Sequence, residues 1–322
     1  MRNGIAIAGT IILDKIYDIS AYPNAGELTK ICDIRFSVGG CVPNVGIDIK
    51  RIAPSIPVIA YGRMGNDSEG DYIIDELQKN GILTDNLVRC DKKTSFTDVM
   101  SIVGGQRTFF TYAGAGADFG ADDIDLSDTD VKMLHLGYFL LLDKVDSGDG
   151  VEILKNAKKL GIKTSIDLVT ENSNRYSLVI PALEYTDNLI INECEAGMLT
   201  GIEPKNENLY EIAKRLMDLG VKERVIIHKP DIAFCLSKDG YTALPSYDIP
   251  NEYIKGTTGA GDAFCAGALK QIHDGASDLE ILEFASATAV MALSSPDATS
   301  GVGSAEEISN LKNTFKRKNI CL

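Results

Sequence analysis

The chain has 322 residues, enough for one large α/β domain with insertions or for two domains of about 150 residues each. Its hydrophobic fraction of 44% and charged fraction of 24% are those of an ordinary globular protein, which excludes disordered, collagen-like and coiled-coil chains. The formal net charge is −14 and no dense run of Lys or Arg occurs, so nucleic acids and anionic membrane surfaces are not expected as partners. An anionic ligand would need local donors, such as backbone N–H groups and a metal ion.

The cysteines and the N-terminus indicate the compartment. The seven cysteines are scattered and never spaced C-x-x-C, which indicates reduced thiols rather than a disulfide framework or a zinc site. The apolar run in residues 1–14 is interrupted by Asp14 and predicts a first β-strand, not a signal peptide. No apolar run approaches the ~18 residues of a membrane span. The sequence therefore predicts a cytoplasmic protein.

The N-terminal part mixes two kinds of structure. Residues 16–38 and 94–112 show partial period-two alternation with Gly turns, which predicts exposed antiparallel strands of a small separate sheet. Between them, residues 57–62 predict a strand, and the segment from Asn66 to Gly81 predicts a helix of the main layer. The small sheet is therefore inserted within the α/β unit, and a single domain over 1–322 is expected, with the strands of the small sheet drawn from about residues 14–38 and 94–112.

From residue 130 onward, short apolar strands alternate with helical periods. The predicted strands are 131–137, 163–167, 189–192 and 224–228. Helical spacing through Leu154 ends at Gly161, and a second helix through Leu216 ends at Gly220. Such a βαβα series predicts a mostly parallel sheet covered on both faces, with ligands bound beyond the carboxyl ends of its strands.

The most informative segment runs from Lys255 to Leu269. Amphipathic helical spacing begins at Ala263, so Gly259, Ala260 and Gly261 are predicted at a helix N-terminus, where unpaired N–H groups form an anion site. Asp262 falls in the first turn, beside the phosphate that such a site would hold. A carboxylate there suits a general base that accepts a proton from an attacking hydroxyl, although helix capping alone also favours an acidic residue.

Two further segments offer polar groups at turns. Gly39 and Gly40 allow a ligand to approach the backbone closely, and Asn44 offers a donor and an acceptor suited to sugar hydroxyls. Asn192 and Glu195 follow a predicted strand and open a helix. Their spacing is also that of a capping box, so a structural and a functional role are both consistent with them.

Four motifs together carry a resemblance to a known family. They are GG-x-x-x-N (Gly39, Gly40, Asn44), G-x-x-G-x-D-x-x-G (Gly62, Gly65, Asp67, Gly70), N-x-x-E (Asn192, Glu195) and T-T-G-A-G-D-x-F (Thr257 to Phe264). In order and rough spacing the chain resembles the ribokinase-like, PfkB-type carbohydrate kinases over nearly its whole length. The resemblance implies ATP-dependent phosphorylation of a primary hydroxyl by a three-layer α/β/α protein, whose β-sheet lid closes over the sugar and mediates a homodimer.

The resemblance also implies roles for individual residues. Asp262 is similar to the family's catalytic base, and Gly259 to Gly261 are similar to its anion hole. The implied nucleotide contacts are Asn192, Glu195, Lys229, Thr258 and Gly261, with Glu195 organising Mg²⁺ through water. The implied substrate contacts are Asp14, Gly39, Gly40, Asn44 and Arg107, the last in the lid.

The chain departs from the family pattern at two positions. Gly256 stands where an Asp commonly contributes to a monovalent-cation site, so potassium activation is doubtful. Pro230 stands in a turn that usually offers a glycine N–H to the nucleotide, and it has no N–H to offer; Lys229 beside it could contact phosphate instead.

Two other function classes compete with a sugar kinase. A dinucleotide-binding oxidoreductase is disfavoured because no G-x-G-x-x-G joins an early strand to its helix. A catalytically weak sugar or nucleoside sensor on the same fold is consistent with Pro230 but not with the complete Gly259 to Asp262 segment. Cys41 stands where some members of the family have Lys, which favours a neutral acceptor over a phosphorylated one. The sequence does not choose among neutral sugars and nucleosides.

Overall fold

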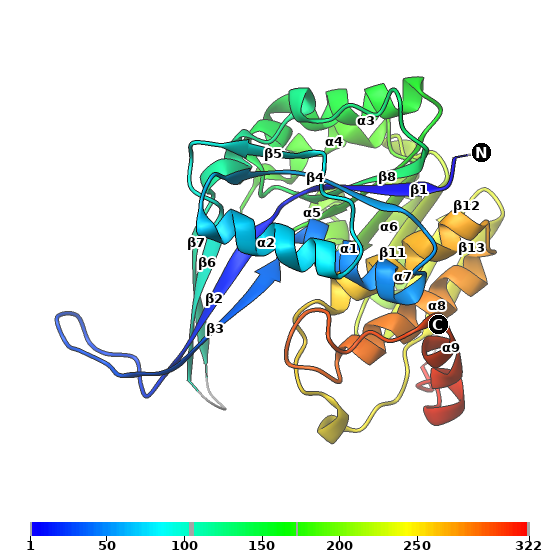
Figure 1. Ribbon diagram of the computed structural model, residues 1–322. Helices are drawn as coiled ribbons and strands as arrows, with labels where there is room; N and C mark the ends of the chain where they lie inside the picture. The colour runs from blue at the N-terminus through cyan, green and yellow to red at the C-terminus, as the bar shows by residue number, and fades with distance from the viewer. Residues whose placement is uncertain (1, 103–105, 172, 321–322) are drawn as a thin grey trace.

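The structure is a computed structural model that describes residues 2–102, 106–171 and 173–320 (Figure 1). Its main sheet has nine strands, of which those from β11 to β5 are mutually parallel and β12 and β13 form an antiparallel edge hairpin. In spatial order they are β13 (Gly240–Pro245), β12 (Ile232–Ser237), β11 (Arg224–His228), β10 (Asn188–Asn192), β9 (Lys163–Leu168), β8 (Val131–Phe139), β1 (Gly4–Gly9), β4 (Val58–Gly65) and β5 (Leu87–Cys90).

Helices cover both faces of this sheet. One face carries α1 (Cys41–Ile52), α2 (Ser68–Lys79), α7 (Ala260–Asp274), α8 (Asp278–Ala292) and α9 (Ala305–Thr314). The other carries α3 (Gly150–Lys159), α4 (Ile180–Leu183), α5 (Glu193–Thr200) and α6 (Leu209–Asp218). The predicted three-layer α/β/α architecture is therefore confirmed.

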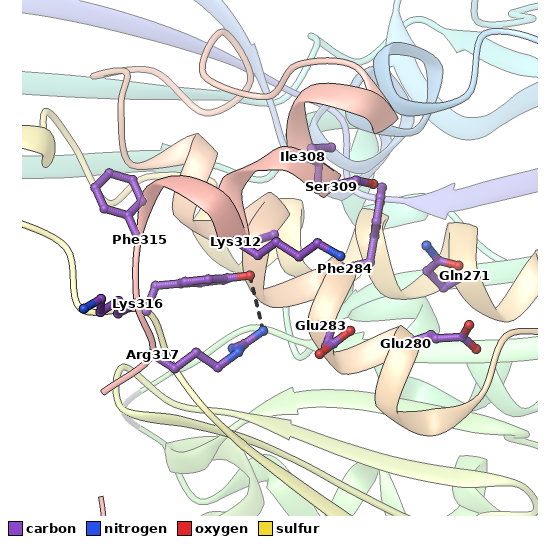
Figure 2. Close-up of a pocket in the computed structure, with 12 residues that line it drawn as sticks. Gln271, Glu280, Glu283, Phe284, Ile308, Ser309, Lys312, Phe315, Lys316 and Arg317 are labelled. Carbon is purple, nitrogen blue, oxygen red and sulfur yellow. Dashed lines mark hydrogen bonds between the residues drawn. The ribbon is translucent and has the colours of Figure 1, made fainter. Parts of the chain in front are cut away.

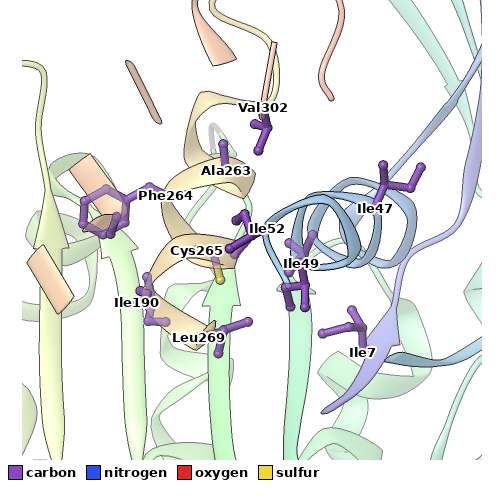
Figure 3. Close-up of a cluster of buried hydrophobic side chains, with 14 of the residues drawn as sticks. Ile7, Ile47, Ile49, Ile52, Ile190, Ala263, Phe264, Cys265, Leu269 and Val302 are labelled. Carbon is purple, nitrogen blue, oxygen red and sulfur yellow. The ribbon is translucent and has the colours of Figure 1, made fainter. Parts of the chain in front are cut away.

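The strand sequences explain the two layers. In β1, Ile5 and Ile7 belong to the core under α1 and α7, whereas Ala6 and Ala8 belong to the core on the opposite face. Figure 3 shows Ile7 with Ile49 of α1 and Leu269 of α7 in the first of these cores. Successive strand residues point to opposite faces, so a strand buried on both sides needs a continuous apolar run.

A second sheet of four strands stands beside the main one, and we call it the lid sheet (Figure 1). Its order is β3 (Ile31–Gly39), β2 (Ile12–Ile19), β6 (Phe96–Ile102) and β7 (Arg107–Tyr112). The pairs β2–β3 and β6–β7 are antiparallel, as expected, but β2 and β6 pair in parallel. Both strands leave the main sheet in the same direction, which makes their pairing parallel.

The N-terminal strand differs from the prediction. The sequence predicts one strand over residues 1–14 and lid strands from about residue 14, but the structure divides residues 1–14 between β1 and β2, so the lid sheet already begins at Ile12. The division begins at Gly9, whose φ of 138° and approach to Gly137 leave no room for a side chain: a Cβ would lie 2.5 Å from the Gly137 carbonyl oxygen. Glycine thus lets the chain pass from one sheet into the other.

Candidate active site

The N-terminus of α7 lies where the sequence predicts it. Gly259 is the N-cap with φ 79°, and a Cβ there would lie 2.3 Å from the Ala298 carbonyl oxygen, so only glycine fits. The first N–H groups of a helix have no intrahelical acceptor. The Ala260 amide donates to the Thr257 carbonyl at 3.3 Å, which leaves the amides of Gly261 and Asp262 better placed to receive an anion. Thr258 is exposed in the loop just before the helix.

Asp262 is the third residue of α7 and is 7% exposed. Asn44 Nδ2 donates to its Oδ2 at 2.9 Å, and the Tyr138 hydroxyl lies 3.0 Å from both carboxylate oxygens. These contacts fix the carboxylate from two sides. They bring together three segments of the chain: the start of α1, the end of β8 and the start of α7.

The surroundings of Asp262 raise its proton affinity. Burial, and then the neighbouring carboxylate of Asp167, raise the pKa of Asp262 to about 7, against the opposing effect of the hydrogen bonds from Asn44 and Tyr138. A carboxylate with a pKa near neutrality can accept a proton from a hydroxyl and later release it. Asp262 therefore has the burial, orientation and pKa of a general base.

Tyr138 is a site residue that the sequence analysis did not identify. It has a left-handed φ of 62°, which is unusual for a bulky side chain, and its N–H donates to Asp167 Oδ1 at 2.6 Å. This backbone conformation directs the phenol to Asp262, while the amide holds Asp167. A non-glycine residue with positive φ next to a functional carboxylate is the kind of strain that the surrounding structure must support.

Asn192 and Glu195 form the predicted capping box of α5. Asn192 Oδ1 accepts from the Glu195 N–H at 2.9 Å, and Glu195 Oε2 accepts from the Asn192 N–H at 3.1 Å. The remaining oxygen of Glu195, Oε1, accepts from Thr170 Oγ1 and from Asn192 Nδ2, each at 2.8 Å. Burial raises the pKa of Glu195 to about 7. The box is structural, yet it also presents a buried carboxylate to the cavity described next.

A cavity of about 210 Å³ joins these groups at the carboxyl ends of the parallel strands. It is lined by Tyr138, Asp167, Leu168, Val169, Thr170, Ile190, Asn192, Glu195, His228, Gly259, Gly261, Asp262 and Cys265. Three carboxylates face one cavity without a Lys or Arg in its lining. Oxygen donors of this kind suit Mg²⁺, and because both Glu195 oxygens already accept hydrogen bonds, they fit an ion bound through water better than one bound directly.

The predicted substrate residues at the start of α1 lie close to Asp262 through Asn44. Gly40 is the N-cap of α1 with φ 89°, and a Cβ there would lie 2.5 Å from the Thr10 carbonyl oxygen. Asn44 is one turn further along the helix, and its Oδ1 is buried without a hydrogen-bond partner in the described part of the chain. The structure therefore leaves an unsatisfied acceptor on the residue that holds Asp262.

Gly39 and Asp14 lie against each other across β2 and β3. A Cβ on Gly39 would lie 2.5 Å from Asp14 Oδ2, so glycine makes room for the carboxylate. Burial raises the pKa of Asp14 to about 6. Asp14 thus occupies the base of the lid sheet, next to the glycine pair that precedes α1.

Arg107 and Lys229 are not brought to these groups. Arg107 is exposed in β7 and pairs with Ser101, whereas Asp14 is level with Thr97, about four residues or 13 Å nearer the main sheet. The Lys229 ammonium donates to the Pro204 carbonyl at 2.9 Å and to Asn206 Oδ1 at 2.7 Å, so it anchors the loop before α6. The contact of Lys229 with a phosphate stays a prediction, and its hydrogen bonds to Pro204 and Asn206 do not support it.

The motif containing Asp67 has a structural role at the base of the lid sheet. Asp67 caps α2 by accepting from the Gly70 N–H at 2.9 Å, and it also accepts from the Thr94 N–H at 2.8 Å and from Thr94 Oγ1 at 2.5 Å. Thr94 Oγ1 in turn accepts from the Gly65 N–H at 3.0 Å. Thr94 precedes β6, so this network ties the lid strand to β4 and α2.

Gly256 is surrounded by backbone. A Cβ at this position would lie 2.9 Å from both Pro296 Cα and the Ser295 carbonyl oxygen. The space that a larger side chain would need at this position is therefore occupied.

A larger cavity lies elsewhere, between α8, α9 and the C-terminal segment (Figure 2). Its volume is about 510 Å³, and Arg317 on its rim donates to the Tyr247 hydroxyl at 3.3 Å. No residue singled out in the sequence lines it. The candidate active site is the smaller cavity, because the titratable groups converge there.

Comparison with known proteins identifies the class of protein that has this fold and site. Residues 7–304 match the family model described as pfkB family carbohydrate kinase. The chain therefore belongs to the pfkB family of carbohydrate kinases.

Individual relatives agree with this assignment. The ribokinase of Staphylococcus aureus is 21% identical over 315 residues, covering 97% of this chain and 100% of that protein. The 5-dehydro-2-deoxygluconokinase of Clostridium perfringens is 24% identical, covering 84% and 82% respectively. The chain spans only 56% of a bifunctional ribokinase/ribose-5-phosphate isomerase A of Fructilactobacillus sanfranciscensis (24% identical) and 64% of the probable fructokinase-6 of Arabidopsis thaliana (28% identical).

Solved structures show the same fold. Arabidopsis thaliana ribokinase, complexed with ribose and ATP, matches with a TM-score of 0.82 at 22% identity, covering 97% of this chain and 99% of that chain. Cryptococcus neoformans ribokinase in complex with ADP matches with a TM-score of 0.80 at 18% identity, covering 96% of this chain and 99% of that chain.

Across the described residues, no helix is both long enough and apolar enough to span a membrane.

Proposed function

We propose that this protein is an ATP-dependent sugar kinase that phosphorylates a primary hydroxyl of a small neutral sugar. The observation that carries the proposal is Asp262: a buried carboxylate with a pKa of about 7, fixed by Asn44 and Tyr138 at the glycine-rich N-terminus of α7. The chain belongs to a family of carbohydrate kinases, which supports phosphoryl transfer as the reaction that Asp262 assists.

In the proposed reaction Asp262 accepts the proton of the sugar hydroxyl. The hydroxyl oxygen then forms a bond to the γ-phosphorus of ATP while the bond to the β,γ-bridging oxygen breaks, and ADP leaves. The amides of Gly261 and Asp262, at the positive end of α7, stabilise charge on the transferred group. Mg²⁺ held near Glu195 and Asn192 would neutralise the polyphosphate beside three carboxylates.

Several groups support a neutral acceptor. Asn44 Oδ1 and the half-buried Asp14 offer acceptors for hydroxyl groups, and the 210 Å³ cavity has neither Lys nor Arg in its lining. A second phosphate on the acceptor would need paired cations. We place Gly39 and Gly40 beside the sugar because their missing side chains leave the backbone accessible.

We also propose that two copies associate through the lid sheet. Strands β3 and β7 expose large apolar side chains on one face of this sheet, namely Ile34, Phe36, Phe110 and Tyr112, each at least 44% exposed. An exposed apolar patch of this kind is typical of an interaction surface. Light scattering after size exclusion tests the dimer, which Phe36→Ser with Phe110→Ser is expected to convert to monomer.

The function is tested by a screen for ADP release with Mg·ATP. The panel contains pentoses, hexoses, keto-deoxy acids and nucleosides, because the relatives named above and an adenosine kinase of Saccharomyces cerevisiae span these classes. Sugar-dependent ADP formation supports the kinase and identifies its acceptor. Sugar binding by calorimetry without ADP formation from any bound compound would instead support a sensor on this fold.

A further inference from the structure

A group of soft and hard metal ligands lies beneath the candidate active site. Cys41 begins α1, His135 is in the middle of β8, Asp167 is near the end of β9, and Cys265 is in the second turn of α7. Ligand atoms of Cys41, His135 and Asp167 all lie within 4.8 Å of one another. Cys265 Sγ lies 3.6 Å from His135 Nε2, and Figure 3 shows this side chain on the face of α7 toward the sheet.

The separation of His135 from Asp167 fits a tetrahedral ion. Zinc bonds of about 2.0–2.1 Å to nitrogen or oxygen and about 2.3 Å to sulfur place neighbouring ligand atoms about 3.3–3.8 Å apart. His135 Nε2 lies 3.4 Å from Asp167 Oδ2, which is an edge of such a tetrahedron before any ion is added. Cys41 Sγ lies within 4.8 Å of both ligand atoms, whereas Cys265 Sγ is outside this group although it lies 3.6 Å from His135 Nε2.

Both harder ligands are oriented through their second polar atom. His135 Nδ1 lies 3.0 Å from Ser165 Oγ, which leaves Nε2 facing the cluster. Asp167 Oδ1 accepts from the Tyr138 N–H at 2.6 Å, which leaves Oδ2 facing His135. Metal-binding His and carboxylate side chains are held in this way by neighbouring groups that fix their orientation.

The thiols are positioned by close packing. Cys41 is fully buried over Gly137, where a Cβ would lie 1.9 Å from Cys41 Sγ, so the glycine is required for the thiol to occupy this place. Asp167 and Cys265 also line the cavity that contains Asp262, and this cavity provides a path for an ion.

We propose that Cys41, His135 and Asp167 form a binding site for one thiophilic divalent ion of the zinc type, with Cys265 beside it. Binding releases the proton of the Cys41 thiol, so that one thiolate, one neutral imidazole and one carboxylate hold the ion, and a water molecule from the cavity completes a tetrahedral shell. The site is distinct in chemistry from the oxygen-lined place of Mg²⁺ near Glu195. An ion here would occupy the floor of the cavity beside Asp262.

The test uses the chelator-treated full chain with Zn²⁺ alone and with Co²⁺ alone. Zinc titration by calorimetry is expected to show one ion per chain, and Co²⁺ is expected to give a thiolate charge-transfer band with the strong visible absorption of a tetrahedral site. Cys41→Ser is expected to remove that band and to weaken zinc binding more than about 10-fold, and Cys265→Ser is expected to change both readouts less. The matched controls are Cys235→Ser, a buried thiol of β12, and Cys194→Ser, an exposed one.

A second variant changes the residue that orients His135 and leaves the cysteines in place. Ser165→Ala leaves all three ligands in place and is expected to weaken zinc binding about 10- to 100-fold. Thermal melting without metal checks that each variant is folded. The proposal is overturned if the folded wild type binds no stoichiometric zinc, or if the band survives in Cys41→Ser. Neither readout depends on kinase activity.

Discussion

Asn44 and Asp262 lie 218 positions apart in the chain, and Asn44 Nδ2 donates a hydrogen bond to Asp262 Oδ2 at 2.9 Å. The contact joins the first turn of α1 to the first turn of α7. It stabilises the charged form of a carboxylate whose burial favours the neutral form. The pKa of Asp262 therefore depends on a balance between burial, which raises it, and hydrogen bonding, which lowers it. Substitutions can shift this pKa in either direction.

The first prediction concerns the pH dependence of turnover. Asn44→Ala and Tyr138→Phe each remove a donor that lowers the pKa of Asp262, so the pKa of this carboxylate should rise. The acid limb of the kcat/KM profile should then move to higher pH in both variants than in the wild type. Steady-state rates from pH 5.5 to 9 measure the limb. An unchanged limb in both variants would assign it to another group.

The second prediction concerns stability. Three carboxyls have raised pKa values in the folded protein: Asp14 at about 6, Glu195 at about 7 and Asp262 at about 7. Their protonated forms stabilise the fold below the unfolded values near pH 4, and this contribution is lost as the pH rises to about 7. The melting temperature of Asp262→Asn relative to wild type should thus be higher at pH 8 than at pH 4. A difference independent of pH would contradict the raised pKa.

The third prediction concerns the base of the lid sheet. Thr94→Val removes the hydroxyl that joins Asp67 to the Gly65 N–H, and it leaves that buried amide without its acceptor. The free energy of unfolding should fall by about 1–3 kcal/mol, and KM for the sugar should rise because the lid is less firmly attached. Urea unfolding and kinetics measure these effects. Thr111→Val, which alters only a contact between β6 and β7, serves as the control and should change both values less.

The fourth prediction concerns monovalent cations. Because backbone atoms of Ser295 and Pro296 fill the space beside Gly256, we expect no cation site there. The rate should be the same in potassium, sodium and choline chloride at equal ionic strength. Gly256→Asp should lower stability rather than create potassium activation. A several-fold stimulation of the wild type by potassium would refute this prediction.

Much of the fold could be predicted because its strands are buried on both faces. The run RVIIH forms β11 at its predicted bounds, and LIIN forms β10 with one added residue. Short, continuous apolar runs between helical segments are typical of strands of a parallel sheet that is buried on both faces. The glycines before an amphipathic repeat also predicted the start of α7 correctly. The β12–β13 hairpin was missed, although Asp239-Gly240 between two apolar runs is a hairpin signal.

The site was harder to predict where it depends on contacts distant in sequence. Tyr138 reads as one more apolar residue of a strand, and nothing local predicts the left-handed φ that turns its hydroxyl toward Asp262. The side chains of the proposed metal site, Cys41, His135 and Asp167, also have no local spacing, because α1, β8 and β9 bring them together only in the fold. Conversely, the motif with Asp67 was easy to find, yet its contacts tie the lid sheet to α2.

The account depends most directly on Asp262 as the general base. With the acceptor found in the screen, kcat should fall about 10²- to 10⁴-fold in Asp262→Asn, while sugar and nucleotide affinities measured by calorimetry change little. Asp274→Asn, at the exposed C-terminal end of the same helix, is the matched control and should retain wild-type turnover. If folded Asp262→Asn turns over within a few-fold of wild type, Asp262 is not the base and the account is wrong.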